Sequence, residues 1–162
     1  MEEEIINYYN FNYDKKHKLL VDLLTAPDTG LAIFKFRFDL MQVAGLIGAN
    51  EDKEIISENK EVLVGDNVFA SNTHLYTGIL LIALGKKQDI DLVKEINKQK
   101  VYEISSSYVN GGLETIQSWL DEDNSEDKYE IIISKLIDLN YIELIEGEAS
   151  APTGGPLDGP EF

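Results

Sequence analysis

Apolar residues recur at helical spacing along most of this chain, and that pattern constrains its fold more than any other feature. A helix buries one face by placing apolar residues three and four positions apart. In the first such segment the apolar positions are Leu19, Leu20, Leu23 and Leu24. Asp14 is a suitable N-cap for it, and Pro27 followed by Gly30 ends the pattern. The sequence therefore predicts a helix between Asp14 and Pro27.

Two more helices are expected in the middle of the chain. The stretch from Leu40 to Ile47 predicts a short buried helix broken by Gly45 and Gly48. A helix beginning at Asn72 or Thr73 is apolar on most sides, which indicates a central position in the core. Its apolar residues are Leu75, Ile79, Leu80, Leu81, Ile82 and Leu84.

The last third of the chain predicts further helices. One begins at Asp89 and continues past Tyr102, until Ser105 to Ser107 and Gly111-Gly112 weaken it, so that residues 113–120 form a separate or kinked helix. The final helix is capped by Asn124 or Ser125, and Glu126 and Asp127 favour its positive end. Its apolar stripe is Tyr129, Ile132, Ile133, Leu136 and Ile137.

Strand signals are few. Ala32, Phe34, Phe36 and Phe38 alternate with Ile33, Lys35 and Arg37, which predicts a strand with an inward aromatic face. Residues 61–64 predict a second strand before a turn at residues 65–67, and the two are expected to pair. Residues 141–145 predict a third short strand. The predicted fold class is mainly α with a minor β part: a compact multi-helix domain with two or three short strands.

Composition changes near the C-terminus. Residues 149–162 hold three of the four prolines, so the expected division is a single helical domain at 1–147 and an irregular Gly/Pro-rich tail at 148–162. Such a tail is either a linear motif that ends in the Phe162 carboxylate or a dispensable extension. The sequence leaves both open.

Charge is unevenly distributed. Residues 101–162 carry 14 Asp and Glu against Lys128 and Lys135, a net of −12 out of the chain's −16. A surface this acidic repels nucleic acid and anionic membranes and favours a basic protein partner. Arg37 is the only arginine, which also disfavours direct reading of nucleic acid. Imitation of DNA by the acidic surface is a further hypothesis that the composition alone allows.

The chain contains no cysteine and no apolar run near the roughly 20 residues of a membrane span. We therefore expect a soluble, cytoplasmic protein that does not contact membranes.

Catalytic and metal sites are not indicated. Asp121, Asp123 and Ser125 match the first ligand positions of a calcium loop, but Glu126 stands where that loop needs glycine, and Ile132 where it needs a carboxylate. His17 and His74 lack the neighbours of a zinc or iron site and are expected to be surface or capping residues. We expect no enzymatic activity, no metal and no cofactor.

Two family resemblances concern the C-terminal part. The run from Tyr102 to Leu120, with Gly111-Gly112 and the helix around residues 131–139 after it, resembles the end of ligand-binding domains in tetracycline-repressor-type regulators. That resemblance implies a helical module that dimerises or encloses an apolar ligand, and residues 1–60 lack the basic helix-turn-helix of those regulators. The helix at 127–139 followed by the strand at 141–145 resembles the end of a winged-helix module, many of which mediate protein contacts.

Two functional hypotheses follow. The first is a non-enzymatic acidic module of the inhibitor, immunity or adaptor type, which docks a basic partner through its C-terminal third. Its candidate partner-binding residues are Glu114, Asp121, Glu122, Asp123, Glu126, Asp127 and Glu130. The alternative is a ligand-sensing or dimerising helical domain. Its candidate pocket or homodimer-face residues are Tyr102, Tyr108 and Trp119, whose simpler role is core packing.

Overall fold

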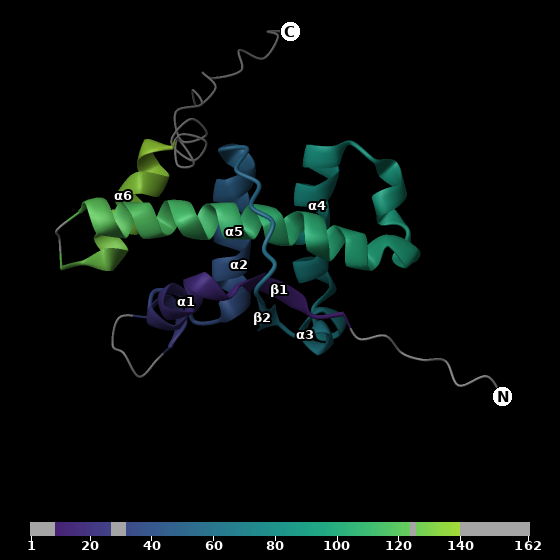
Figure 1. Ribbon diagram of the computed structural model, residues 1–162, viewed down its shortest axis with the longest axis horizontal. Coiled ribbons are helices and arrows are strands. Elements are labelled where there is room, and N and C mark those ends of the chain that lie inside the picture. The colour runs from purple at the N-terminus through teal and green to yellow at the C-terminus, as the bar shows by residue number, and fades with distance from the viewer. Residues whose placement is uncertain (1–8, 27–31, 124–125, 140–162) are drawn as a thin grey trace, which may run out of the picture.

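The computed structural model describes residues 9–26, 32–123 and 126–139. Helices dominate it, with one small antiparallel sheet (Figure 1). In chain order the elements are β1 (Phe11–Asp14), η1 (Lys15–His17), α1 (Lys18–Thr25), α2 (Arg37–Asn50), β2 (Lys60–Val64), α3 (Asp66–Ser71), α4 (Thr73–Lys87), η3 (Ile90–Val93), η4 (Glu95–Asn97), α5 (Lys98–Glu122) and α6 (Lys128–Asp138). The expected mainly helical fold with a minor β part is confirmed.

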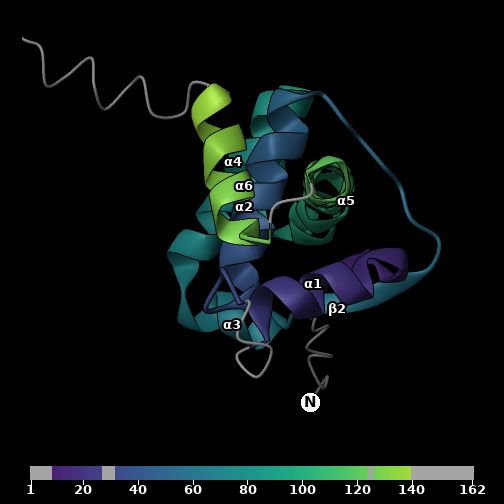
Figure 2. The same ribbon diagram turned by 90° about the vertical axis from the view of Figure 1, so that its left-hand side faces the viewer.

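The long helix α5 is the centre of the molecule. It runs along the longest axis, and α2 and α4 cross behind it while the sheet lies below (Figure 1). Seen from its end, α5 lies beside α2 and above the layer of α1 and the strands (Figure 2). Its fully buried residues include Val101, Val109, Leu113 and Ile116. We expected α4 to be the core helix, but Leu81 of α4 is 62% exposed, so that expectation was wrong.

Glycines let α2 and α5 approach to backbone contact. A Cβ atom on Gly48 would lie 1.9 Å from the Tyr108 carbonyl oxygen, and one on Gly112 would lie 1.8 Å from the Ala44 carbonyl oxygen. Only residues without a side chain fit at such distances. The predicted breaks at Gly45, Gly48 and Gly111-Gly112 are therefore wrong: both helices continue through them, because burial outweighs the roughly 1 kcal/mol helix penalty of each glycine.

An extended segment, residues 51–59, passes over the opposite side of α5; we call it the strap. It connects α2 to β2 and crosses the front of α5 (Figure 1). The backbone N–H of Ile55 donates to the Ser107 carbonyl at 2.9 Å, and the Asn110 side-chain amide donates to the Ile55 carbonyl at 3.1 Å. A Cβ on Gly111 would lie 1.9 Å from the Lys53 carbonyl oxygen. α5 is thus held between α2 and the strap.

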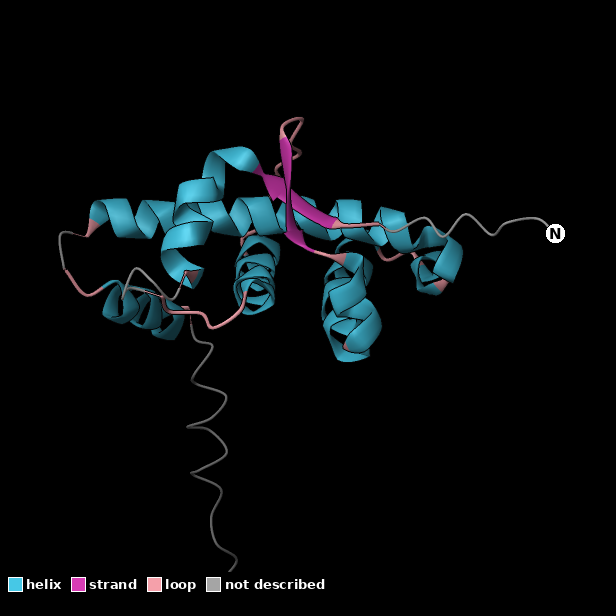
Figure 3. Cartoon of the chain, turned by 90° about the horizontal axis from the view of Figure 1, so that it is seen from below, coloured by secondary structure: helices cyan, strands magenta, loops and turns pink. Residues whose placement is uncertain are grey.

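The sheet pairs β2 with a strand that the sequence pattern did not predict. β1 and β2 are antiparallel, with Phe11 opposite Val64 and Asp14 opposite Lys60, and Figure 3 shows them crossing below α5. Phe11 and Tyr13 are fully buried. The predicted strand at 61–64 is confirmed by β2, but its expected partner at 32–38 is not a strand.

Residues 32–36 have no regular structure, and α2 begins at Arg37. The backbone N–H groups of Ile33 and Phe34 both donate to the Leu24 carbonyl at 2.9 Å, which folds this segment back on the end of α1. Phe36 is 46% exposed and stacks on Phe38 with ring centroids 5.0 Å apart. The alternation therefore does not mark a strand: in the described part of the chain, residues 32–36 form no strand pairing, and two of their N–H groups bind the end of α1.

The helices begin close to the predicted positions, but three of the capping residues differ from the prediction in detail. Asp14 accepts a hydrogen bond from the Lys16 N–H at 3.0 Å and so caps η1, which leads directly into α1, and Asn72 precedes α4 as expected. Asp89 caps the short η3 instead of a long helix. Asp127 is the N-cap of α6, and Ile131 and Ile132 are its buried residues. Residues 124–125, the expected strand at 141–145 and the expected tail at 148–162 lie outside the described residues.

Within the described ranges, no helix has the length and apolar character needed to cross a membrane.

Candidate protein-interaction site at the α5–α6 turn

Six carboxylates gather where α5 ends and α6 begins; we call this surface the acidic end. All six are exposed: Asp121, Glu122, Asp123, Glu126, Asp127 and Glu130. They come from the last turn of α5, the connection and the first turn of α6, at one end of the long axis (Figure 1). The fold therefore brings six of the seven predicted partner-binding residues into one region.

Local hydrogen bonds shape this region. The Asp127 carboxylate accepts from the backbone N–H groups of Tyr129 and Glu130 at 3.0 and 3.1 Å, which is the usual role of an N-cap. Gln117 donates its side-chain amide to Asp121 at 2.8 Å. Among the residues that the structure describes, no His, Asp and Glu side chains group in a way that could hold a metal ion.

Lysines do not neutralise most of the acidic end. In the described part of the chain, no ion pair joins Asp121, Glu122, Glu126 or Glu130 to a lysine. The lysines of α4, of the segment before α5 and of the start of α5 pair instead with acids of the strap, η3 and α3. The acidic end therefore keeps its negative potential.

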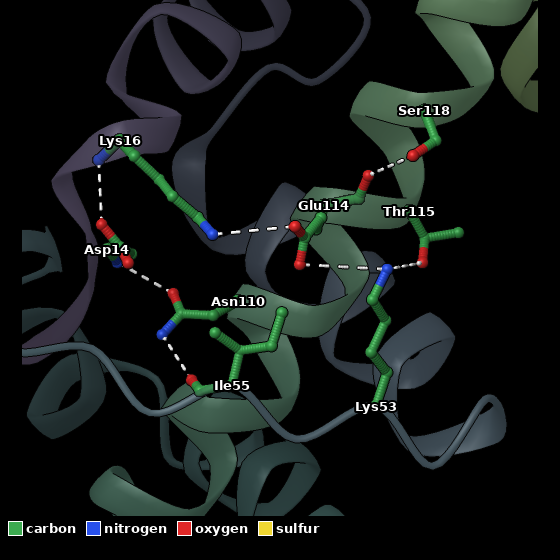
Figure 4. A network of polar contacts seen from close by, with 8 residues as sticks. All are labelled: Asp14, Lys16, Lys53, Ile55, Asn110, Glu114, Thr115 and Ser118. Atoms are coloured by element: carbon green, nitrogen blue, oxygen red, sulfur yellow. Dashed lines mark hydrogen bonds and ion pairs between the residues drawn. The ribbon is translucent and has the colours of Figure 1, made fainter.

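Glu114 does not belong to this surface. Its carboxylate lies 3.8 Å from the Lys16 ammonium and 3.9 Å from the Lys53 ammonium, and Lys53 also donates to Thr115 at 3.3 Å (Figure 4). Two lysines from the first part of the chain thus surround it. Glu114 was predicted as a partner-binding residue, but its carboxylate already pairs with these two lysines, a contact that the sequence does not reveal.

The three aromatic residues of the alternative hypothesis do not form one pocket. Tyr102, Tyr108 and Trp119 are 3%, 3% and 8% exposed and lie at separate positions along α5. Tyr102 packs against Phe11, Phe69 and Tyr76, while the ammonium of Lys86 lies 5.5 Å from the Tyr108 ring centre. Their burial supports core packing instead of a dimer face.

A partly buried polar cluster holds Tyr102 in place. Its hydroxyl donates to Asp66 at 3.0 Å, and Asp66 also pairs with Lys98 at 3.0 Å. Burial, together with the Asp66 carboxylate, raises the pKa of Tyr102 well above its usual value. This cluster ties the start of α5 to the start of α3.

A polar groove of about 770 Å³ lies between β1, the strap and the N-terminal half of α5. Most of its polar groups already bind one another. Ser106 donates to the Asn12 carbonyl, Ser107 and Lys87 both bind Glu54, and Lys100 pairs with Asp89. These contacts attach the strap and β1 to α5, so the groove is best explained as part of the scaffold.

Two residues had more structural importance than the sequence suggested. Asn110 is 1% exposed, accepts from the Asp14 N–H at 2.8 Å and donates to the Ile55 carbonyl, so it joins β1 to the strap (Figure 4). The sequence signal that could have indicated this role is the polar side chain of Asn110 between Val109 and Gly111, in a stretch that is otherwise apolar or small. His17, expected at the surface or as a cap, occupies the N-cap position of α1 but makes no side-chain capping bond. It is 6% exposed, and its Nε2 has no hydrogen-bond partner among the described residues. His74 is exposed, as expected.

A family model described as DNA sulphur modification system-associated protein 4 matches residues 11–145, from the first residue of β1 to beyond α6. The chain belongs to this family. The family is neither of the two that the sequence resembles. No curated protein and no solved structure gave a significant match.

Proposed function

We propose that this protein is a non-enzymatic accessory subunit of a DNA sulphur modification system, and that its acidic end docks a basic surface of another protein of that system. Membership in the family supports the assignment to a DNA sulphur modification system. The observation that carries the docking role is the exposure of six carboxylates at the α5–α6 turn, most of them without a lysine partner. Such a patch raises the rate of association with a positively charged surface, and the affinity of the complex falls as salt screens the charges.

The proposed partner is a protein with a basic face, because the acidic end repels the phosphate backbone of DNA. Proteins that act on DNA carry basic surfaces, so the other proteins of such a system are expected to offer the positive surface that the acidic end requires. In this proposal the protein acts in the cytoplasm and contributes contacts instead of catalytic groups.

The test is co-purification of the tagged, full-length chain with the other proteins of the same system, expressed together. We expect retention at about 50 mM salt and loss at about 500 mM, where the Debye length falls from roughly 14 Å to about 4 Å. The double variant Glu122→Lys/Glu126→Lys should weaken retention at low salt about tenfold or more.

A matched control is available on the same molecule. Glu58 and Glu95 are also exposed, and Glu58→Lys/Glu95→Lys changes the net charge by the same amount away from the acidic end. This control should retain the partner. Equal loss in both double variants would mean that only net charge matters, and retention in both would reject the docking site.

A further inference from the structure

The outer surface of α6 carries an apolar stripe beside the acidic end. Tyr129, Ile133 and Ile137 are four residues apart and therefore share one face of the helix. Tyr129 is 57% exposed and Ile137 is 47% exposed, whereas Ile131 and Ile132 on the inner face are almost fully buried. We call Tyr129, Ile133 and Ile137 the α6 stripe.

The charges around the α6 stripe are of one sign on its outer side. Glu130 follows Tyr129 directly in α6, and Glu126 lies in the connection just before Asp127, the N-cap of this helix; both are exposed. The two lysines of α6, Lys128 and Lys135, are each three positions from one of the buried isoleucines and four from the other. They therefore share the inner face of the helix, where both are half buried. A molecule that approaches the α6 stripe from solvent therefore meets apolar atoms bordered by carboxylates.

We propose that the α6 stripe and its flanking carboxylates bind an amphipathic helix of the partner, with aliphatic residues on one face and lysine or arginine beside them. This inference rests on the proposed function and specifies its partner. Tyr129 and Ile137 are eight positions apart, so the stripe is about 12 Å long, which matches two turns of a helix bound through residues i, i+4 and i+8.

The carboxylates beside the α6 stripe oppose binding of two other molecules or segments, a second copy of the chain and the chain's own C-terminal residues. A second copy of the chain, packed stripe to stripe, would bring Glu126 and Glu130 close to their own equivalents, and like charges across an interface oppose binding. The chain's own residues 140–162 contain five Asp and Glu and no lysine, arginine or histidine, so they also lack the complementary charge. A basic amphipathic helix satisfies both the apolar stripe and the carboxylates.

The test uses a synthetic peptide probe with the full-length protein. The peptide is about 20 residues long, so that it forms a helix, and carries leucine on one face with lysine on both sides. A second peptide has the same composition with the leucine positions scrambled. Fluorescence anisotropy should show the patterned peptide binding about tenfold more tightly than the scrambled one.

Variants of two isoleucines locate the binding. Ile137→Ser should weaken binding of the patterned peptide about five- to tenfold, as expected for an apolar residue that contributes about 1 kcal/mol. Ile96→Ser is the matched control, because Ile96 is 88% exposed and lies in η4, just before the opposite end of α5. This control should leave the affinity unchanged.

The possible outcomes separate this inference from the proposed function. Equal, salt-sensitive binding of both peptides would overturn the role of the α6 stripe while leaving charge-based docking intact. A melting temperature lowered by more than about 4 °C in Ile137→Ser alone would mean that the chain's own residues cover the stripe. Concentration-dependent self-association that Ile137→Ser removes would assign the stripe to a second copy. Either of these last two results would also overturn the inference.

Discussion

The backbone of Gly112 lies against Ala44 so closely that a Cβ atom on Gly112 would stand 1.8 Å from the Ala44 carbonyl oxygen. This contact sets the spacing between α2 and α5, around which the rest of the core packs. A methyl group at Gly112 has no space unless the two helices separate.

Gly112→Ala should therefore lower the free energy of unfolding by about 3 kcal/mol or more, despite the better helix propensity of alanine. Gly85→Ala in α4 is the matched control, because a Cβ there meets no atom within 4 Å. The control should be neutral or stabilising by up to about 1 kcal/mol. Urea unfolding of the two variants measures both changes, and equal effects would contradict the close packing.

Asn110→Ala should destabilise the protein by about 2–4 kcal/mol, because it leaves the Asp14 N–H and the Ile55 carbonyl without their partner. Gln117→Ala removes a side-chain hydrogen bond on the surface of the same helix, so its cost should stay near 0.5 kcal/mol. Hydrogen exchange should in addition show faster exchange at Asp14 in the Asn110 variant. If the Asp14 amide kept its protection, the bridge between β1 and the strap would not be the cause.

Tyr102→Phe removes the hydrogen bond to Asp66 and should cost about 1.5–3 kcal/mol, since the acceptor is charged and only partly exposed. Tyr76→Phe is the comparison, because the Tyr76 ring packs on Tyr102 but its hydroxyl makes no hydrogen bond within the described residues. The second variant should change stability by less than about 0.5 kcal/mol. Thermal unfolding of the two single variants distinguishes the contribution of the hydrogen bond from that of ring packing.

The stability of the protein should fall as the pH drops below about 6.5. Burial, with Lys16 and Lys53 nearby, lowers the pKa of His17 below its usual 6.5, although Asp14 and Glu114 act in the opposite direction. Between that folded-state pKa and 6.5 the unfolded chain binds more protons, so stability is complete above 6.5 and is lost as the pH falls toward the folded-state pKa.

The slope from this single group is at most about 1.4 kcal/mol per pH unit. His17→Gln should flatten the dependence between pH 7.5 and 5, whereas His74→Gln, at an exposed site, should leave it unchanged. Asp52, Glu61 and Asp89 pair with lysines that lower the pKa of each carboxyl, so their stabilising contributions are lost at more acidic pH. Equal slopes in the two histidine variants would rule out His17 as the source.

Local patterns in the sequence were enough for the helical class, for the Asp14 cap and for most of the acidic end. Capping and helical periodicity depend on residues a few positions apart, and adjacent carboxylates around one turn remain adjacent after folding. For the same reason β2 was predictable from residues 61–64.

Only the tertiary structure decided which segments meet. The alternation at residues 32–38 has the period of a strand, but its backbone turns back onto Leu24 and no strand pairs with it. Glycines that favour a break in an isolated helix are retained in α2 and α5, because each occupies a contact that a side chain would block. Lys16 and Lys53 reach Glu114 from distant parts of the chain. Tertiary contacts, and not the number of acidic residues in the sequence, therefore decide that Glu114 lies outside the acidic end. Interactions between neighbours in the sequence can be read from it directly, whereas those between distant segments depend on the complete fold.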